Sequence, residues 1–494
     1  MFLEALAEGG FQVGELAKVY HPGGIEITSA NKDQAVTETA ELLKRDKVTI
    51  FEATIRHENL FIKADVLVKS GSNIQLIEVK AKSFDPTERN PFFTKASVKK
   101  NKPQLNSQWE PYIMDVAFQA FVIQQAFPDF EVEPFLMLAD KTSIATVDGI
   151  NQRFFLDSSV GGRVSVITAP GTTAASLGAK LLVKVSVSKE VEVAWASQFR
   201  GGHSFSEFVS YLSSLLETNT LAEPVVSGGC KSCEFRIGAD LKSSGLLSGF
   251  ENCWSKARGI KAADFSRPMV FDIWNFRRSE LLLAQEKVFI DQVERDDIDP
   301  REGADGLSAS ERQWLQVEKI IAKESTPYFD SEGMAEEMER WRFPLHFIDF
   351  ETTMVAIPFH AGCRPYEQIA FQFSHHCVNE NGTVEHAGEY LNREKGKYPN
   401  FDFVRNLKRE LEDDNGTIFR FAAHENTVLC QIRQQLLSTD DVSDSRELVA
   451  FIESITASTD SAESEWLGPR NMIDMCELVK LFYYHPPNQW FELD

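Results

Sequence analysis

The stretch that decides the fold is residues 59–82, which read NLFIKADVLVKSGSNIQLIEVKAK. Two runs rich in Val, Ile, Leu and Phe flank Gly71-Ser72-Asn73, a turn signal, and so predict two neighbouring strands joined by a tight connection. A third apolar run at residues 48–55 predicts a strand before them. The three runs together indicate the start of a β-sheet.

The same stretch carries two acids and a lysine. Side chains alternate in direction along a strand, so Glu78 and Lys80 fall on one face and Val79 on the other. A hairpin then brings Asp65 beside Glu78 and Lys80. Two carboxylates that converge with a lysine can hold one or two Mg²⁺ or Mn²⁺ ions, activate a water molecule and offset charge on a phosphate. The alternative is an ordinary amphipathic hairpin with surface charges.

Helices and strands on either side extend the hairpin into a compact α/β unit. Residues 30–47 have helical spacing, residues 112–127 predict an apolar helix, and residues 132–140 predict a further strand. The loop between the hairpin and the apolar helix is basic, with seven Lys or Arg residues against two acids from Lys80 to Lys102. A basic loop of this kind suits a phosphate backbone.

The pattern Asp65, Glu78-x-Lys80 resembles the PD-(D/E)xK nucleases, and among them the RecB-like group, which have a restriction-endonuclease-like core. In that group a Gln/Tyr motif lies on the next helix, and Tyr112 and Gln119 match it loosely. An acid on the preceding helix is also common, and Glu38 or Glu41 could fill that position. The resemblance implies a metal-dependent nuclease. The expected nucleic-acid contacts are Lys95, Lys99, Lys100, Tyr112 and Gln119.

A cysteine segment follows the first unit. Cys230-x2-Cys233 and then Cys253 have a spacing that can bind zinc or an iron–sulfur cluster. The segment is similar to that of cluster-bearing RecB-like nucleases, which implies a 4Fe-4S cluster. The fourth cysteine of that group would precede the nuclease core, and no cysteine occurs there. Zinc with a ligand from elsewhere, or free thiols, remain alternatives.

A second acidic motif lies in HFIDFETT, residues 346–353. Asp349 and Glu351 stand two apart on a predicted strand and face one way. This resembles the first motif of the DEDD exonucleases of the RNase H-like class, which implies two-metal hydrolysis. Glu425, at the start of a predicted helix, and Asp474, at the start of the last one, match the later acids. The final motif of that class is missing before Asp494, which indicates a partial, C-terminally truncated domain.

Bulk properties limit the class of protein. The net charge of −23 argues against non-specific coating of DNA, and the odd number of cysteines, seven, does not suggest a disulfide framework. Residues 1–20 do not read as a signal peptide, and no apolar run is long enough to cross a membrane. We therefore expect a cytoplasmic protein with no membrane partner.

The order of these parts resembles an uncharacterised bacterial family catalogued as a domain of unknown function. We expect a RecB-type core followed by a partial RNase H-like α/β domain. The expected divisions are a nuclease domain at 1–225, a cysteine segment at 226–256, a helical connector at 257–335 and an RNase H-like domain at 336–494.

Three functional hypotheses follow. The first is a metal-dependent nuclease that hydrolyses phosphodiester bonds, with DNA favoured over RNA, in repair or defence. The second is a non-catalytic nucleic-acid-binding or scaffold protein that retains nuclease folds. The third is an RNA exonuclease that works through the C-terminal domain. The sequence does not identify a protein partner.

Overall fold

The structure is a computed structural model, and it describes the chain except for residues 1, 101, 158–164, 440, 460–464 and 487–494. It divides into two compact units. Unit 1 comprises residues 1–220, 352–369 and 393–399, and unit 2 comprises residues 221–351, 370–392 and 400–494. Each unit is a mixed α/β structure, and no sheet in the described parts closes into a barrel.

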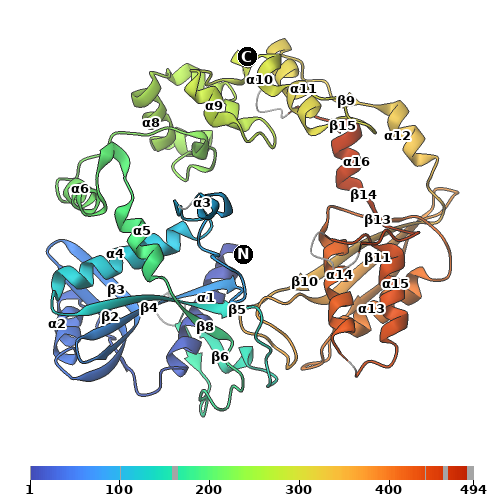
Figure 1. Cartoon of the computed structure of the whole chain (residues 1–494). Coiled ribbons are helices and arrows are strands. Elements are labelled where there is room, and N and C mark those ends of the chain that lie inside the picture. Colours follow the sequence, from blue (N-terminus) through green and yellow to red (C-terminus); the bar gives the residue numbers. More distant parts are fainter. Residues whose placement is uncertain (1, 101, 158–164, 440, 460–464, 487–494) are drawn as a thin grey trace. The chain divides into compact units, whose positions relative to one another are not determined.

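Unit 1 is built on a six-stranded mixed sheet with the order β1-β2-β3-β4-β5-β8 (Figure 1). Strands β2, β3 and β4 form the predicted antiparallel meander, β5 runs parallel to β4, and β8 runs antiparallel to β5. A separate hairpin pairs β6 with β7. The strands are β1 (Ile25–Glu26), β2 (Lys47–His57), β3 (Leu60–Ser70), β4 (Asn73–Phe84), β5 (Glu131–Asp140), β6 (Phe154–Asp157), β7 (Ser165–Thr168) and β8 (Leu182–Ser186).

Helices cover both faces of this sheet. Helix α4 supplies buried Ile113, Val116 and Ala117 to one core, and α1 supplies buried Val13 and Leu16 to the core on the other face. These are called the α4-side core and the α1-side core. The helices of unit 1 are α1 (Phe2–Val19), α2 (Lys32–Leu42), α3 (Lys95–Lys99), α4 (Glu110–Ala126), η1 (Asn151–Arg153), α5 (Ser188–Ala196), η2 (Arg200–Gly202) and α6 (Phe205–Glu217).

A late segment of the chain completes unit 1. Ala356 and Ile357 are buried in the α1-side core. The hydroxyl group of Tyr366 donates a hydrogen bond to the backbone oxygen of Ala81 on β4, at 2.5 Å. This part of the chain follows the second acidic motif in sequence, yet it packs in the first unit.

Unit 2 contains a five-stranded sheet with the order β12-β11-β10-β13-β14. Strands β11 and β12 pair antiparallel, and β13 runs parallel to both β10 and β14. A short antiparallel pair joins β9 and β15. The strands are β9 (Tyr328–Phe329), β10 (Leu345–Thr353), β11 (Ile369–Val378), β12 (Val384–Leu391), β13 (Ile418–Arg420), β14 (Ile473–Asp474) and β15 (Tyr483–Tyr484).

Three helices pack on one face of this sheet, as Figure 1 shows for α13, α14 and α15. Ile348 and Phe350 of β10 point into that core, so the residues between and after them, Asp349 and Glu351, face the other way and are exposed. The helices around this sheet and after it are α13 (Asn400–Leu411), α14 (His424–Leu437), α15 (Ser445–Ile455) and α16 (Met475–Phe482).

Residues 221–343, a range that includes the predicted cysteine segment (226–256) and helical connector (257–335), have a core of their own inside unit 2. Trp254, Val270 and Ile290 are fully buried there. Short helices build this region because few of its apolar runs are long. They are η3 (Gly228–Ser232), α7 (Ala239–Ser243), α8 (Gly249–Arg258), η4 (Ala262–Ser266), η5 (Val270–Asp272), α9 (Ser279–Ala284), η6 (Ile290–Gln292), α10 (Arg295–Ile298), α11 (Ala309–Ala322) and α12 (Ser331–Met338).

Residues 438–465 are rich in Ser, Asp and Glu, a composition that predicts a solvated loop, and this prediction is wrong for the described part of the range. Helix α15 lies within this range, and its Leu448, Phe451, Ile452 and Ile455 are buried in the core under the sheet helices. The surrounding Ser, Asp and Glu residues obscure an apolar stripe with helical spacing. Across the described residues, no helix combines the length and the apolar character that a membrane crossing requires.

The position of α15 predicts a stability effect. Ile452→Ala should lower the free energy of unfolding of unit 2 by about 2–5 kcal/mol, because it removes a fully buried side chain and leaves a cavity. Urea unfolding followed by tryptophan fluorescence measures the change. Arg446→Ala, on the exposed face of the same helix, is the control and should unfold close to the wild type. Equal midpoints for both variants would show that α15 is not packed in the core.

Candidate active site

Glu78 and Lys80 lie on the same face of β4, as strand alternation predicts. The ammonium group of Lys80 is 2.6 Å from Glu78 Oε1 and 2.8 Å from Asp115 Oδ2. Asp115 comes from α4, which covers this face of the sheet. Glu78 is only 5% exposed, so its ion pair with Lys80 is shielded from water on most sides.

Gln119 lies one helical turn after Asp115 on α4 and completes the network. Its side-chain amide donates to Glu78 Oε2 at 2.8 Å and to Asp115 Oδ1 at 3.1 Å. The other end of this amide, Gln119 Oε1, is buried without a hydrogen-bond partner. An unpaired buried acceptor is costly, so this oxygen is suited to a donor or a cation.

Asp65 reaches the site in a different way from the one expected of a regular hairpin. Strand β3 pairs with β4 from Val66 onward, so the two strands separate at Asp65. There the Asp65 carboxylate accepts a hydrogen bond from the backbone N–H of Val79 at 2.7 Å and takes the place of a strand carbonyl. The side-chain alternation of β3 also inverts: Ala64 and Leu67 both contribute to the α4-side core.

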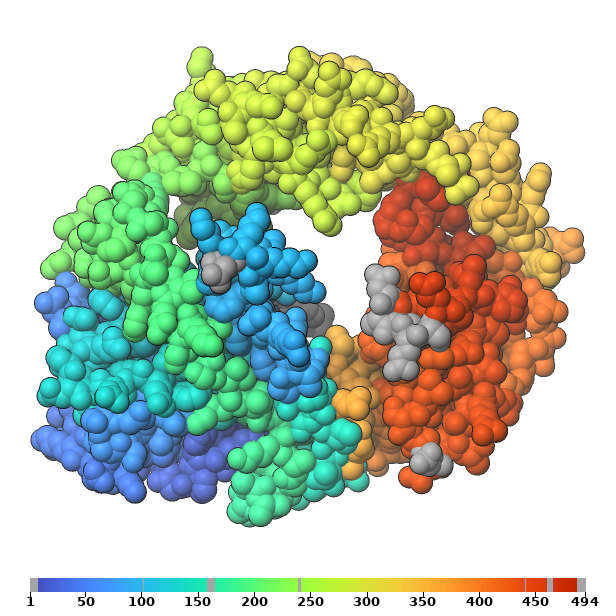
Figure 2. Space-filling model, viewed as in Figure 1, coloured from blue at the N-terminus to red at the C-terminus, as the bar shows by residue number. Residues whose placement is uncertain are grey.

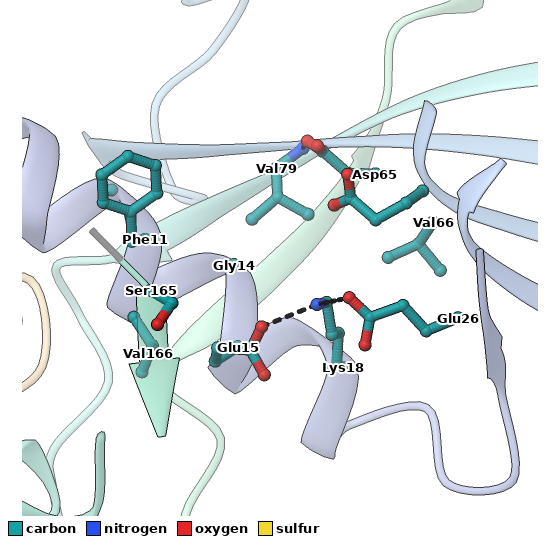
Figure 3. A pocket seen from close by; sticks show the side chains of 12 residues that line it. Phe11, Gly14, Glu15, Lys18, Glu26, Asp65, Val66, Val79, Ser165 and Val166 are labelled. Carbon is teal, nitrogen blue, oxygen red and sulfur yellow. Dashed lines mark hydrogen bonds and ion pairs between the residues drawn. The ribbon is translucent and has the colours of Figure 1, made fainter. Parts of the chain in front are cut away.

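Asp65 lines an acidic pocket of ≈ 550 Å³ in unit 1. Figure 3 shows its side chain directed into this pocket, beside the ion pairs of Lys18 with Glu15 and Glu26, each 2.6 Å long. Glu52 of β2 also lines the pocket and has a φ of 58°, an uncommon backbone conformation for a residue with a side chain. Four carboxylates and Lys18 therefore line the pocket, and Glu52 also pairs with Lys63.

The electrostatics of the site reflect crowded acids. Burial and the Asp65 charge raise the pKa of Glu78. Burial, opposed in part by the Val79 hydrogen bond, raises the pKa of Asp65, and Glu52 adds to the rise. Burial also acts to raise the pKa of Asp115, but hydrogen bonds from Lys80 and Gln119 outweigh it and leave this pKa low. The site has more acid than one lysine neutralises.

A basic and aromatic surface adjoins this network. Lys82 Nζ lies 4.8 Å from the ring centre of Trp109 and 5.2 Å from that of Tyr112, at the start of α4. Lys95, Lys99 and Lys100 are exposed on and after α3. The rings of Phe84, Phe92 and Trp109 are buried and pack together. The segment of α3 is drawn in azure on the surface of unit 1 in Figure 2.

The second acidic set lies in unit 2, beyond the residues through which the parallel strands β10 and β13 pair. Asp349 is on β10, Asp474 ends β14, and Glu425 opens α14. Burial raises the pKa of Glu425, and the charges of Asp349 and Asp474 add to the rise while Arg420 opposes it. Glu425 Oε2 is buried without a hydrogen-bond partner. Glu351 is exposed on the same face as Asp349.

Asp474 has a structural role in this arrangement. One carboxylate oxygen accepts from the backbone N–H groups of Ala422 and Cys476, each at 2.9 Å. The other accepts from Arg420 at 2.9 Å. Asp474 therefore caps α16 and ties β13 to β14, and these contacts use both of its oxygens.

The three cysteines of the sequence motif are half-buried and reduced. Cys230 lies in η3 and Cys233 directly after it, and both pack against the core of residues 221–343. Cys253 is on α8. The iron–sulfur cluster stays a prediction that rests on these three residues.

Two expected residues lie elsewhere. Glu38 is half-buried and Glu41 is exposed on α2, and their side chains contact Gln34 and Lys44 respectively. Glu15 of α1 is the helix acid that lines the pocket. Asp115 was not predicted from the sequence, although its spacing of four from Gln119 on a helix places both on one face.

The raised pKa of Glu78 predicts a pH dependence of stability. A carboxyl whose pKa is higher in the folded than in the unfolded state makes the native protein bind more protons, so the free energy of unfolding falls as pH rises. The loss should begin above pH 4.5, the ordinary glutamate value, and continue until the raised pKa is passed. Asp65 contributes with the same sign.

Unfolding in urea at pH values from about 5 to about 8, without divalent ions, tests this. Glu78→Gln should flatten the decline, whereas Glu58→Gln, in the turn between β2 and β3, should keep the wild-type profile. A decline of equal slope in Glu78→Gln would contradict the assignment.

Comparisons with known proteins give one match. A family model described as a domain of unknown function, DUF2779, matches residues 346–490, which include β10 and all later strands and helices. Neither the curated proteins nor the solved structures contain a match to the chain. A DUF2779 domain is therefore found in the second half of the chain, consistent with the expected uncharacterised family.

Proposed function

We propose that this protein is a metal-dependent nuclease that hydrolyses phosphodiester bonds through unit 1, with DNA favoured over RNA. The observation that carries the proposal is the buried network in which Lys80 and Gln119 both contact Glu78, next to Asp65. A buried acid that is held by a lysine and an amide, next to a second acid that lines a pocket, is a typical arrangement for catalysis.

Asp65 and Glu78 are the residues that would hold Mg²⁺ or Mn²⁺, because carboxylate oxygens are the ligands these ions prefer. The excess of carboxylates around one lysine, and the unpaired Gln119 Oε1, fit a cation at this position. A bound ion would polarise the phosphate and lower the pKa of an attacking water molecule.

The chain's own residues have separate tasks in this proposal. Lys80 orients the attacking water or offsets negative charge that develops on the phosphate, which a positioned ammonium group can do most strongly where water is excluded. Gln119 orients the Glu78 carboxylate, and Asp115 holds the Lys80 ammonium group at 2.8 Å. Network contacts of this kind keep reacting groups in one geometry.

A nucleic-acid backbone is the substrate class that suits the adjoining surface. Exposed Lys95, Lys99 and Lys100 can pair with phosphates, and the half-buried ring of Tyr112 is near enough to the surface to contact a base. The strongly negative net charge of −23 makes such a local basic surface necessary for binding a polyanion.

The finer fold assignments belong to the same proposal: a RecB-type fold for unit 1 and a partial RNase H-like fold for unit 2. Support for the second comes from the position of Asp349 on β10, just beyond the residues that pair with β13, and of Glu425 at the start of the helix that follows β13, where β10 lies between β11 and β13. Ligands of open α/β sheets bind at such switch points. Because Asp474 is committed to Arg420 and α16, the proposal gives unit 2 a binding role and leaves RNA hydrolysis there as the alternative.

A comparison of cleavage by variants of unit 1 with cleavage by a variant of unit 2 tests the proposal. We expect Lys80→Ala to reduce the rate of Mg²⁺- or Mn²⁺-dependent cleavage by roughly 10²–10³-fold, since a transition-state charge loses its partner. Glu78→Ala should abolish cleavage. The assay uses end-labelled single- and double-stranded DNA and RNA with the full chain.

Glu41→Ala, an exposed acid of the same unit, is the matched control and should cleave at the wild-type rate. Asp349→Ala should also keep cleavage. Loss of activity in Asp349→Ala alone would move catalysis to unit 2. An inactive but folded wild type would favour the scaffold hypothesis.

The basic surface predicts a change in salt dependence. A variant with Lys95, Lys99 and Lys100 replaced by alanine should bind single-stranded DNA more weakly at low salt. The slope of log K against log salt should become shallower by roughly 0.7 for each phosphate that a lysine no longer neutralises. Fluorescence anisotropy in Ca²⁺ without cleavage measures both quantities, and an unchanged slope would place the nucleic acid elsewhere.

A further inference from the structure

A second polar group lies in the core of unit 2, away from the exposed acids of β10. His346 of β10 and His375 and Cys377 of β11 are buried, with 2%, 1% and 6% of their surfaces exposed. His346 Nδ1 is 2.9 Å from His375 Nε2, and Cys377 Sγ is 3.3 Å and 3.2 Å from these two nitrogens. In the described part of the chain, these three ligand atoms lie within 4.8 Å of one another.

On each imidazole, the ring nitrogen that faces away from the other histidine contacts a carboxylate. His346 Nε2 is 2.9 Å from Asp414 Oδ1, and His375 Nδ1 is 3.2 Å from Glu410 Oε2. A carboxylate accepts hydrogen bonds, so each of these outer nitrogens carries the proton of its ring. In a neutral ring the inner nitrogen, His346 Nδ1 or His375 Nε2, then has a lone pair, and only a proton on one inner nitrogen or a cation can join the two rings.

Those two lone pairs point at each other across 2.9 Å. Two acceptors at hydrogen-bond distance repel one another unless something positive or a donor lies between them. The Cys377 sulfur is within 3.3 Å of both nitrogens. A thiol has one proton, a weak donor, which cannot serve both nitrogens at once. A cation among the three ligand atoms, which lie within 4.8 Å of one another, would contact both nitrogens and the sulfur.

We propose that His346 Nδ1, His375 Nε2 and Cys377 Sγ bind a zinc ion in the core of unit 2. Two imidazole nitrogens and a thiolate are ligands typical of Zn²⁺. Metal-bound histidines usually donate their outer N–H to a carboxylate, which fixes the ring and its tautomer, and Asp414 and Glu410 occupy those positions. Oxygen-preferring Mg²⁺ does not suit this ligand set.

The ligand spacing needs little change for an ion to enter. Around a tetrahedral Zn²⁺, with bonds of about 2.0–2.1 Å to nitrogen and about 2.3 Å to sulfur, the ligand atoms lie roughly 3.3–3.6 Å apart. The three observed distances are a few tenths of an ångström shorter, so a small outward movement of the side chains is sufficient. A water molecule can take the fourth position.

Two glycines leave room for the carboxylate supports. A Cβ at Gly388 would lie 2.2 Å from Glu410 Oε2, and a Cβ at Gly416 would lie 2.7 Å from His346 Nε2 and 2.0 Å from the backbone oxygen of Pro344. The backbone therefore approaches these side chains more closely than any larger residue allows. The site joins β10, β11 and the end of α13, which indicates a structural role.

Metal analysis of the full chain tests the proposal. A variant with Cys230, Cys233 and Cys253 replaced by serine removes the other cysteine motif and is the parent for every measurement. We expect this parent to retain about one zinc per chain, and Co²⁺ in its place to give a thiolate-to-cobalt charge-transfer band. Cys377→Ser in the parent should lose both signals, and Cys430→Ser, a buried cysteine of the same unit outside the group, should keep them.

Asp414→Asn and Glu410→Gln test the supports, and each should weaken zinc binding by roughly 10–100-fold without removing a ligand. Circular dichroism establishes whether each variant is folded. The parent keeps His346, His375 and Cys377 unchanged. If the folded parent binds neither zinc nor cobalt, the proposal is overturned. Equal zinc affinity in the parent and in His375→Asn also overturns it, and binding of copper with no binding of zinc overturns the choice of metal.

Discussion

The structure of unit 1 depends on the burial of one carboxylate, that of Glu78. A buried acid is stable only when donors or cations reach it, and the apolar faces of β3 and β5 supply none. The donors come from Lys80 on the same strand and from Gln119 on α4. The turn of α4 that carries Asp115 and Gln119 must therefore lie over Glu78 and Lys80 of β4. These polar contacts set the position of α4 along the sheet, which apolar contacts alone would define less sharply.

Unit 2 also buries polar groups that need hydrogen-bond partners, and there the groups are imidazoles. His346 and His375 are buried between a sheet and its helices, and carboxylates at the end of α13 and just after it satisfy their outer nitrogens. Both units thus place a polar group in the layer between sheet and helix. In unit 1 the buried Gln119 Oε1 has no hydrogen-bond partner, in unit 2 two ring nitrogens meet at 2.9 Å, and a bound cation would suit each position.

The parts of this fold that depend on local pattern could be predicted from the sequence, and the parts that depend on strand separation or pairing could not. Alternation alone places Glu78 with Lys80, and Asp349 with Glu351, on one face. The inverted alternation at Asp65 arises because β3 leaves β4 there, which no residue pattern records. His346 and His375 are far apart in sequence, and only the pairing of β10 with β11 brings them together.

The course of the chain has a consequence for how this protein can be divided. It passes between the two units five times, at residues 220/221, 351/352, 369/370, 392/393 and 399/400. No single cut releases either unit whole, because Ala356 and Ile357 belong to the core of unit 1. Replacing either unit by that of another protein would therefore require joins at several of these crossings and not at one.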